Sequence, residues 1–150
     1  REHGKGDIAE FRIVEEAAME AKKSRPQPVW KIAYAGAIGG QAMTGIPAME
    51  RLREKFPALK IWPFELPLAK LDSDGLADTR VVVAEVLTTL NATNQQSSEI
   101  RDEAQVRSIC EALAERDANG KLAAMFGGEA KLTDAQKAKV SAEEGWILGI

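Results

Sequence analysis

Hydrophobic positions along the chain follow two spacings, one typical of amphipathic helices and one typical of strands. Helical spacing, bounded by capping residues, glycine or proline, predicts helices at residues 7–23, 46–56, 99–118 and 133–144, and a short one at 121–126. Runs of β-branched and aromatic residues predict strands at 29–35, 59–65 and 81–87. Loops are expected at 66–80 and 91–98.

Helices and strands alternate along the chain, which predicts an α/β domain with a parallel or mixed sheet. Neither an internal repeat nor a linker interrupts residues 1–150, so we expect a single domain. Three strands are few for such a sheet. The chain begins at Arg1, with no initiator methionine and no signal-peptide pattern. We therefore expect further strands of the same sheet to precede it.

Glu85 is a charged residue in the middle of an apolar run. Six of the seven residues 81–87 are apolar, which is typical of a strand covered on both faces. A buried carboxylate without a partner is strongly destabilising. Such a residue is typical of a site that binds a cation, pairs with a base or performs acid–base chemistry. The alternative is that Glu85 ends the strand and reaches solvent, or pairs with a nearby lysine or arginine.

Asp102 is a second candidate carboxylate. It stands four residues before Val106 and seven before Ile109, so the three share one face of the predicted helix. This placement aims its carboxylate along the sheet toward the end of the Glu85 strand. Glu85 and Asp102 together would form a hard oxygen site suited to Mg²⁺ or Mn²⁺. The alternative is an acid placed in a first helical turn by the helix dipole alone.

A glycine-rich turn that precedes the second predicted helix is a candidate anion site. Its glycines and polar residues are Gly36, Gly39, Gly40, Gln41 and Thr44. Backbone N–H groups near a helix start can approach a phosphate, so a phosphate-bearing small molecule is the ligand that this turn would bind. The spacing matches neither the dinucleotide fingerprint nor the phosphate loop. The alternative is that glycine serves only a tight turn and close packing.

Composition narrows the function classes. The net charge of −3 and the pI of about 5.3 disfavour a basic surface that coats nucleic acid, but they permit a local acidic metal site. No apolar run is long enough to span a membrane, and a cytoplasmic protein is expected. Cys110 has no disulfide partner and is interpreted as a small buried hydrophobic residue. His3 is the only histidine, which rules out a histidine-based triad within this chain. The tryptophans, expected to be core or surface anchors, are Trp30, Trp62 and Trp146.

Five stretches carry a resemblance to known proteins: Gly36–Pro47, Ile61–Glu65, Ala84–Val86, Arg101–Arg107 and Glu143–Gly149. Together they resemble a bacterial family of predicted nucleases with a ribonuclease-H-like fold, in which the first stretch reads G-G-Q-x-x-T-G-I-P. The resemblance covers most of the chain from about residue 10 onward. Some members of this family carry names from cobalamin or molybdopterin cofactor biosynthesis.

The resemblance implies a ribonuclease-H-like mixed sheet flanked by helices, with its amino-terminal strands upstream of this chain. It also implies a metal-dependent nuclease that hydrolyses phosphodiester bonds of nucleic acid with Mg²⁺ or Mn²⁺. Glu85 would be the second catalytic acid and Asp102 the third, both as metal ligands, while the first acid would precede Arg1. One departure is Leu87-Thr88-Thr89, where the family pattern has an aromatic residue and proline.

Overall fold

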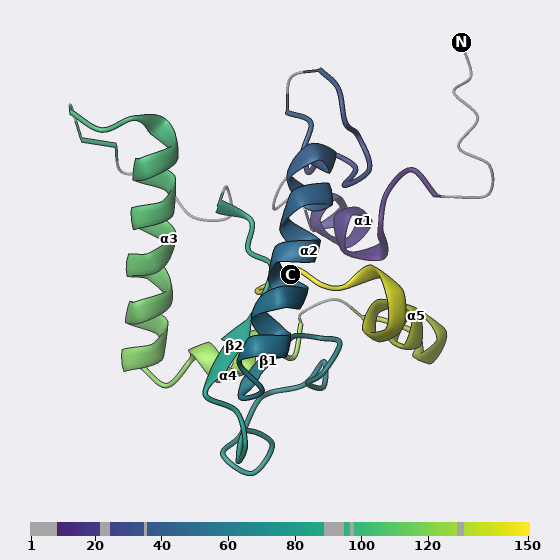
Figure 1. Cartoon of the computed structure of the whole chain (residues 1–150), viewed down its shortest axis with the longest axis vertical. Coiled ribbons are helices and arrows are strands. Elements are labelled where there is room, and N and C mark those ends of the chain that lie inside the picture. The colour runs from purple at the N-terminus through teal and green to yellow at the C-terminus, as the bar shows by residue number, and fades with distance from the viewer. Residues whose placement is uncertain (1–8, 22–24, 35, 89–94, 97, 129–130) are drawn as a thin grey trace.

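The structure is a computed structural model that describes residues 9–21, 25–34, 36–88, 95–96, 98–128 and 131–150. Its elements in chain order are α1 (Ile13–Glu20), α2 (Gly39–Lys55), β1 (Leu59–Ile61), β2 (Val81–Val83), α3 (Arg101–Ala118), α4 (Leu122–Met125), α5 (Asp134–Lys139) and the π-helical turn η2 (Val140–Glu144) (Figure 1). Helices combined with a small parallel sheet confirm the general α/β class.

The sheet consists of β1 and β2, which pair in parallel with Leu59 opposite Val81. The carboxyl-terminal segment runs beside the end of β2, because Glu85 forms a parallel bridge with Ile147. The carbonyl oxygen of Glu85 accepts a hydrogen bond from the backbone N–H of Leu148 at 2.9 Å. Both strands are shorter than predicted. Val81 is 50% exposed, so the expectation of a strand covered on both faces is wrong.

The core is built around two tryptophans. Trp62 and Trp146 are almost fully buried, which confirms them as core anchors, whereas Trp30 is 44% exposed and lies at the surface. The Trp62 ring meets the Phe126 ring edge-on, with 5.3 Å between the ring centroids. The other buried apolar side chains of this cluster are Val14, Ala18, Leu66, Leu71, Val140, Ile147, Leu148 and Ile150.

The predicted ends of two helices agree with the structure because local capping chemistry sets them. The Thr133 hydroxyl accepts a hydrogen bond from the backbone N–H of Gln136 at 3.3 Å and begins α5. Asn119 and Gly120 follow the last residue of α3, and Gly120 takes a positive φ of 66°. The short helix expected before the glycine pair at 127–128 is α4.

The first helix begins later than predicted. Its cap is provided by Glu15, whose carboxylate accepts a hydrogen bond from the backbone N–H of Arg12 at 2.8 Å. This acid pairs with the residue before the first turn, and α1 therefore starts at Ile13. Residues 7 and 8, at the predicted start of the helix, lie outside the described residues.

The predicted strand at 29–35 is wrong for residues 29–34, and residue 35 lies outside the described ranges. The backbone turns twice in this stretch. The Lys31 N–H donates to the Pro28 carbonyl at 3.1 Å, and the Ala37 N–H donates to the Tyr34 carbonyl at 3.1 Å. Tyr34 has a positive φ of 74°, which an extended strand does not allow. Residues with high strand propensity here form turns that lead into α2.

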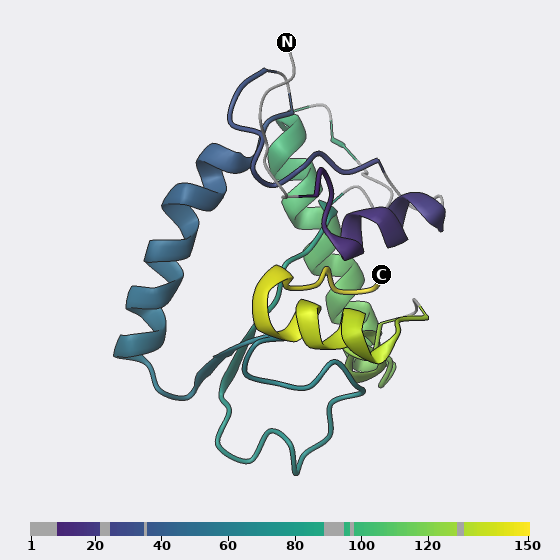
Figure 2. The same ribbon diagram turned by 90° about the vertical axis from the view of Figure 1, so that its right-hand side faces the viewer.

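Helix α2 begins at Gly39, earlier than predicted, and Pro47 lies inside it. Its regularly spaced apolar residues do not form a buried stripe. Ile46, Leu52 and Phe56 are 69%, 41% and 50% exposed. The reason is that α2 lies at one side of the molecule, where Figure 2 shows it apart from the other helices. Gly39 is the one buried residue that the helix contributes among the described residues.

Helix α3 has nearly the predicted bounds, but its buried side is shifted relative to the predicted stripe. Ile109 is buried as expected, whereas Asp102 is exposed. The buried side of the helix carries Ala104 and Ser108 instead, so Asp102 does not begin the buried stripe. Cys110 is also exposed, and its interpretation as a buried hydrophobic residue is wrong.

Candidate functional site

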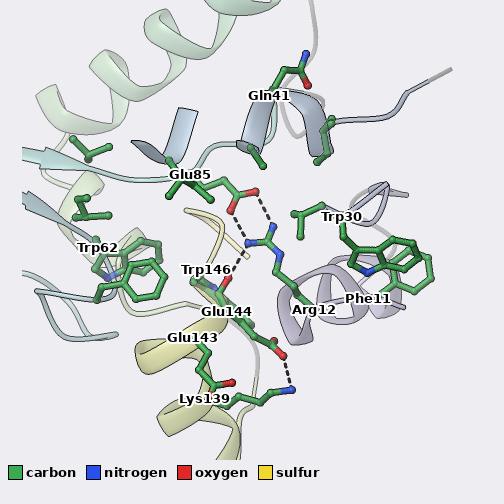
Figure 3. A pocket seen from close by; sticks show the side chains of 18 of the residues that line it. Phe11, Arg12, Trp30, Gln41, Trp62, Glu85, Lys139, Glu143, Glu144 and Trp146 are labelled. Carbon is green, nitrogen blue, oxygen red and sulfur yellow. Dashed lines mark hydrogen bonds and ion pairs between the residues drawn. The ribbon is translucent and has the colours of Figure 1, made fainter. Parts of the chain in front are cut away.

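A pocket of about 900 Å³ opens between the start of α2, the strand ends and the carboxyl-terminal segment (Figure 3). Aromatic rings from segments far apart in the chain line it: Phe11, Trp30, Trp62, Phe64 and Trp146. Its polar lining consists of Arg12, Gln41, Glu85, Lys139, Glu143 and Glu144. A concave, largely apolar surface that holds a few polar groups is the usual form of a small-molecule site.

Glu85 stands just beyond β2 and pairs with Arg12 at the centre of the pocket. Nη1 of Arg12 donates to Oε2 of Glu85 at 2.9 Å, and Nη2 donates to Oε1 at 2.8 Å (Figure 3). The two planar groups therefore meet fork to fork, which is the strongest geometry for this pair. The Arg12 side chain is 15% exposed and that of Glu85 is 42% exposed. Pairing with a basic residue is one of the alternatives that the sequence left open for Glu85.

Arg12 also holds two other parts of the chain. Its Nε donates to Oε1 of Glu15 at 3.1 Å, and its Nη1 donates to the carbonyl oxygen of Glu144 at 2.9 Å. Burial acts to lower the pKa of the Arg12 guanidinium, but the hydrogen bonds and charges of Glu85 and Glu15 outweigh it and raise this pKa above its ordinary value. Arg12, Glu15, Glu85 and Glu144 are called the Arg12 cluster below. The cluster connects the start of α1, the end of β2 and the end of η2.

Glu144 fixes the last turn of η2 against α1. Its Oε2 accepts a hydrogen bond from the backbone N–H of Ile13 at 2.8 Å, and its Oε1 receives Lys139 Nζ at 2.6 Å. Burial acts to raise the pKa of the Glu144 carboxyl. The hydrogen bonds from Lys139 and Ile13 outweigh that effect, and the pKa lies below its ordinary value of 4.5.

This pKa shift predicts a loss of stability in acid. A carboxyl whose pKa is lower in the folded than in the unfolded state stabilises the fold fully above the ordinary value of 4.5. The contribution disappears as the pH falls through the lower folded-state pKa. We expect Glu144→Gln to flatten the acid side of the stability profile, measured by urea unfolding between about pH 6 and pH 3. Parallel profiles for wild type and variant would contradict this expectation.

Gly145 turns the chain between the Arg12 cluster and the core. It has a positive φ of 73°, which favours glycine. A Cβ at this position would lie 3.3 Å from the Phe64 ring and 3.8 Å from Nη1 of Arg12. The absence of a side chain therefore lets Phe64 and Arg12 approach the turn. It also allows Glu144 to face α1 while Trp146 enters the core.

The glycine-rich turn makes only a partial contribution to the pocket. Gln41 lines it, whereas Gly36, Gly39, Gly40 and Thr44 are not among its lining residues. The Gly39 N–H donates to the Lys31 carbonyl at 2.9 Å. The Thr44 hydroxyl donates to carbonyl oxygens of its own helix, at 3.2 Å to that of Gly40 and 3.1 Å to that of Gln41. These contacts favour the packing role of this turn over an anion site.

The geometry around Glu85 fits a metal ion poorly. Both of its carboxylate oxygens accept hydrogen bonds from Arg12, so a metal ion could not be held by both oxygens without displacing the guanidinium. Asp102 is not among the residues that line the pocket. Within the described ranges, no group of three or more histidine, cysteine, aspartate or glutamate residues is placed to hold a metal ion.

Sequence reasoning missed four charged residues of the pocket lining: Arg12, Lys139, Glu143 and Glu144. Arg12, Lys139 and Glu144 carry no local motif, and Arg12 is 73 residues away from its partner Glu85. Glu144 lies in one of the stretches that carry the family resemblance, which is the sequence signal that could have indicated it. Arg12 pairs with Glu85 only because the tertiary fold brings the start of α1 next to the end of β2.

Neither the character of the helices nor similarity to known proteins indicates a function for this chain. In the part of the chain that the structure describes, no helix combines the length and the apolar character needed to cross a bilayer. Comparison with models of protein families, with curated proteins and with solved structures gives no match for this chain. The geometry and the chemistry of the pocket are therefore the features that indicate a function.

Proposed function

We propose that this protein binds a small organic molecule with a flat apolar body in the pocket beside α2. The observation that carries the proposal is the convergence of accessible aromatic rings on a few well-ordered polar groups. Trp30 and Phe64 are 44% and 47% exposed, and both line the pocket. Large rings that face water inside a concave surface are typical of ligand contact, since a ligand removes them from water.

The floor of the pocket is built on two buried indoles that are hydrogen-bonded within the fold. The Trp62 Nε1–H donates to the Pro67 carbonyl at 3.0 Å, and the Trp146 Nε1–H donates to the Ile150 carbonyl at 3.0 Å. Both indoles therefore have their polar atoms satisfied within the fold, and as almost fully buried rings they support the pocket lining from behind. A ligand that binds a preformed floor loses less free energy to ordering the protein.

The charges of the lining give little support to a phosphate-bearing ligand. Three carboxylates line the pocket, against the two cations Arg12 and Lys139. Arg12 already binds Glu85, and Lys139 already binds Glu144. A phosphate would therefore lie close to carboxylates while both cations are already paired, which is electrostatically unfavourable.

Benzyl alcohol is a suitable neutral probe of the proposed site. We expect saturable binding by NMR titration, because its ring matches the apolar lining. Ala42 lines the pocket from α2. Ala42→Leu should abolish this binding, since the longer side chain occupies the space and leucine suits a helix.

The matched control is Ala114→Leu, the same change at an exposed position of α3. It should leave the affinity for benzyl alcohol unchanged. If both leucine variants bind benzyl alcohol as wild type does, the probe sits elsewhere and the proposed site is wrong. Absence of saturable binding to wild type would also contradict the proposal.

The family resemblance supports a second proposal, a metal-dependent nuclease with a ribonuclease-H-like fold. One observation favours it: Glu85 stands at the carboxyl end of a parallel strand, where ligand-binding groups of open parallel sheets gather. This proposal requires Mg²⁺ or Mn²⁺ to raise the melting temperature, and Glu85→Ala to remove that effect. A melting temperature that does not respond to either ion would count against it.

A further inference from the structure

We propose that the ligand of this pocket is an organic cation, namely an aromatic or apolar amine whose N–H group donates to Glu85. This inference rests on the proposed function and names the chemical class of its ligand. The observations behind it are the orientation of the Glu85 carboxylate, the balance of charges along the lining and the accessible aromatic rings of the lining.

Glu85 is held in place but not covered. The Arg12 guanidinium lies in front of the two carboxylate oxygens and donates one hydrogen bond to each, at 2.8 Å to Oε1 and 2.9 Å to Oε2. Each carboxylate oxygen can accept more than one hydrogen bond, so an outer acceptor position remains on each. The side chain is 42% exposed, and these positions are therefore open to the pocket. A ligand N–H would approach one oxygen from its outer side.

Arg12 is the less accessible partner of the pair. Its side chain is 15% exposed, and Glu85, Glu15 and the Glu144 carbonyl oxygen all accept hydrogen bonds from it. An anionic ligand would have to displace Glu85 in order to reach the guanidinium. A cationic ligand meets the carboxylate first and needs no displacement. The geometry therefore selects for positive charge.

The other charged residues around the pocket also favour a cationic ligand. Lys139 contacts Glu144 at 2.6 Å, and Glu143 adds a further carboxylate to the lining. The lining therefore carries an excess of negative charge, and Glu15 adds another carboxylate behind Arg12. Carboxylates that line a concave, partly apolar surface raise the local concentration of cations.

The aromatic walls complete the match. Figure 3 shows Phe11 and Trp30 on one side of the Arg12–Glu85 pair, and Trp30 is 44% exposed. The faces of such rings attract organic cations, and the attraction is strongest for tryptophan. An ammonium group at Glu85 would thus have a carboxylate for its N–H and rings for its apolar body.

Three probes of nearly equal size test the inference on the intact chain: benzylamine, which is protonated at neutral pH, neutral benzyl alcohol and anionic benzoate. We expect benzylamine to bind about tenfold more tightly than benzyl alcohol, because a charge-assisted hydrogen bond replaces a neutral contact. Benzoate should bind more weakly than both. Isothermal titration and NMR titration both measure these affinities.

Glu85→Gln should lower the affinity for benzylamine about tenfold and change that for benzyl alcohol far less. Glu115→Gln, which makes the same change at an exposed position of α3, is the matched control and should affect neither probe. Glu143→Gln is a second variant that removes a lining carboxylate and leaves the bonds of Arg12 intact. It should weaken benzylamine binding less than Glu85→Gln does.

The outcomes separate this inference from the proposed function. Equal affinities for benzylamine and benzyl alcohol in wild type would overturn the cation preference and leave the apolar site standing. Benzoate as the tightest ligand would overturn it as well, because that result assigns recognition to Arg12. If none of the three probes binds, both the inference and the proposed function fail.

Discussion

Replacing Arg12 by alanine should lower the free energy of unfolding by about 3–5 kcal/mol, the usual cost of removing one partner from a buried ion pair. The main reason is Glu15, which is 1% exposed and accepts a hydrogen bond from Nε of Arg12. Without Arg12 this carboxylate loses its opposite charge in a buried position. Glu85 is 42% exposed, so water can replace much of what it loses.

Urea unfolding measures this change, and two variants sharpen it. Arg12→Ala combined with Glu15→Gln should recover part of the loss, because the buried charge is then gone. Arg53→Ala is the surface control, since Arg53 is 41% exposed and pairs with Glu50 and Glu65. It should change stability far less. A loss at Arg12 no larger than that at Arg53 would show that the Arg12 cluster does not hold the fold together.

Gly39→Val should lower the free energy of unfolding by about 1–3 kcal/mol, the range seen when extra atoms are forced into a packed site. A Cβ at Gly39 would lie 2.9 Å from the carbonyl oxygens of Val29 and Lys31, and 2.8 Å from the Ile32 side chain. Carbonyl oxygens belong to the backbone and cannot move without shifting the turn. The hydrogen bond from the Gly39 N–H to the Lys31 carbonyl would be strained too.

The matched control for this change is its neighbour Gly40. A Cβ added there meets nothing within 4 Å, and the residue lies in the same helical turn. Gly40→Ala should therefore raise stability by about 0.5–1 kcal/mol, through the higher helix propensity of alanine. Thermal and urea unfolding of both variants decide the matter. Similar effects at the two positions would mean that close packing is not what requires glycine at 39.

Local chemistry made parts of the fold predictable. Thr133 and Gln136 form a capping box, and Asn119-Gly120 ends α3, because each signal acts within one helical turn. The stretch at 29–34 could not be predicted in this way. Its strand propensity is real, but turns at Pro28 and Tyr34 leave it no neighbouring strand among the described residues. Tertiary context overrides propensity in such segments.

The site was predictable only as far as Glu85. An acid in an apolar run indicated that Glu85 needs a binding partner, and in the structure this partner is Arg12. Arg12 could not be identified as the partner from sequence spacing, since it stands 73 residues away from Glu85, just before the start of α1. Asp102 was chosen from a helical stripe of which Ile109 is buried, but Asp102 and Val106 at its start are exposed. Periodicity alone did not identify which side of that helix packs.

The most direct test of the central claim is a map of backbone and indole N–H chemical shifts during titration with benzylamine. The claim is that the pocket around Arg12 and Glu85 is a ligand site. It predicts saturable changes at the Trp30 indole, at Gln41 and around Glu85, with none along α3. Changes confined to α3, or shifts at the pocket that do not saturate, would contradict it.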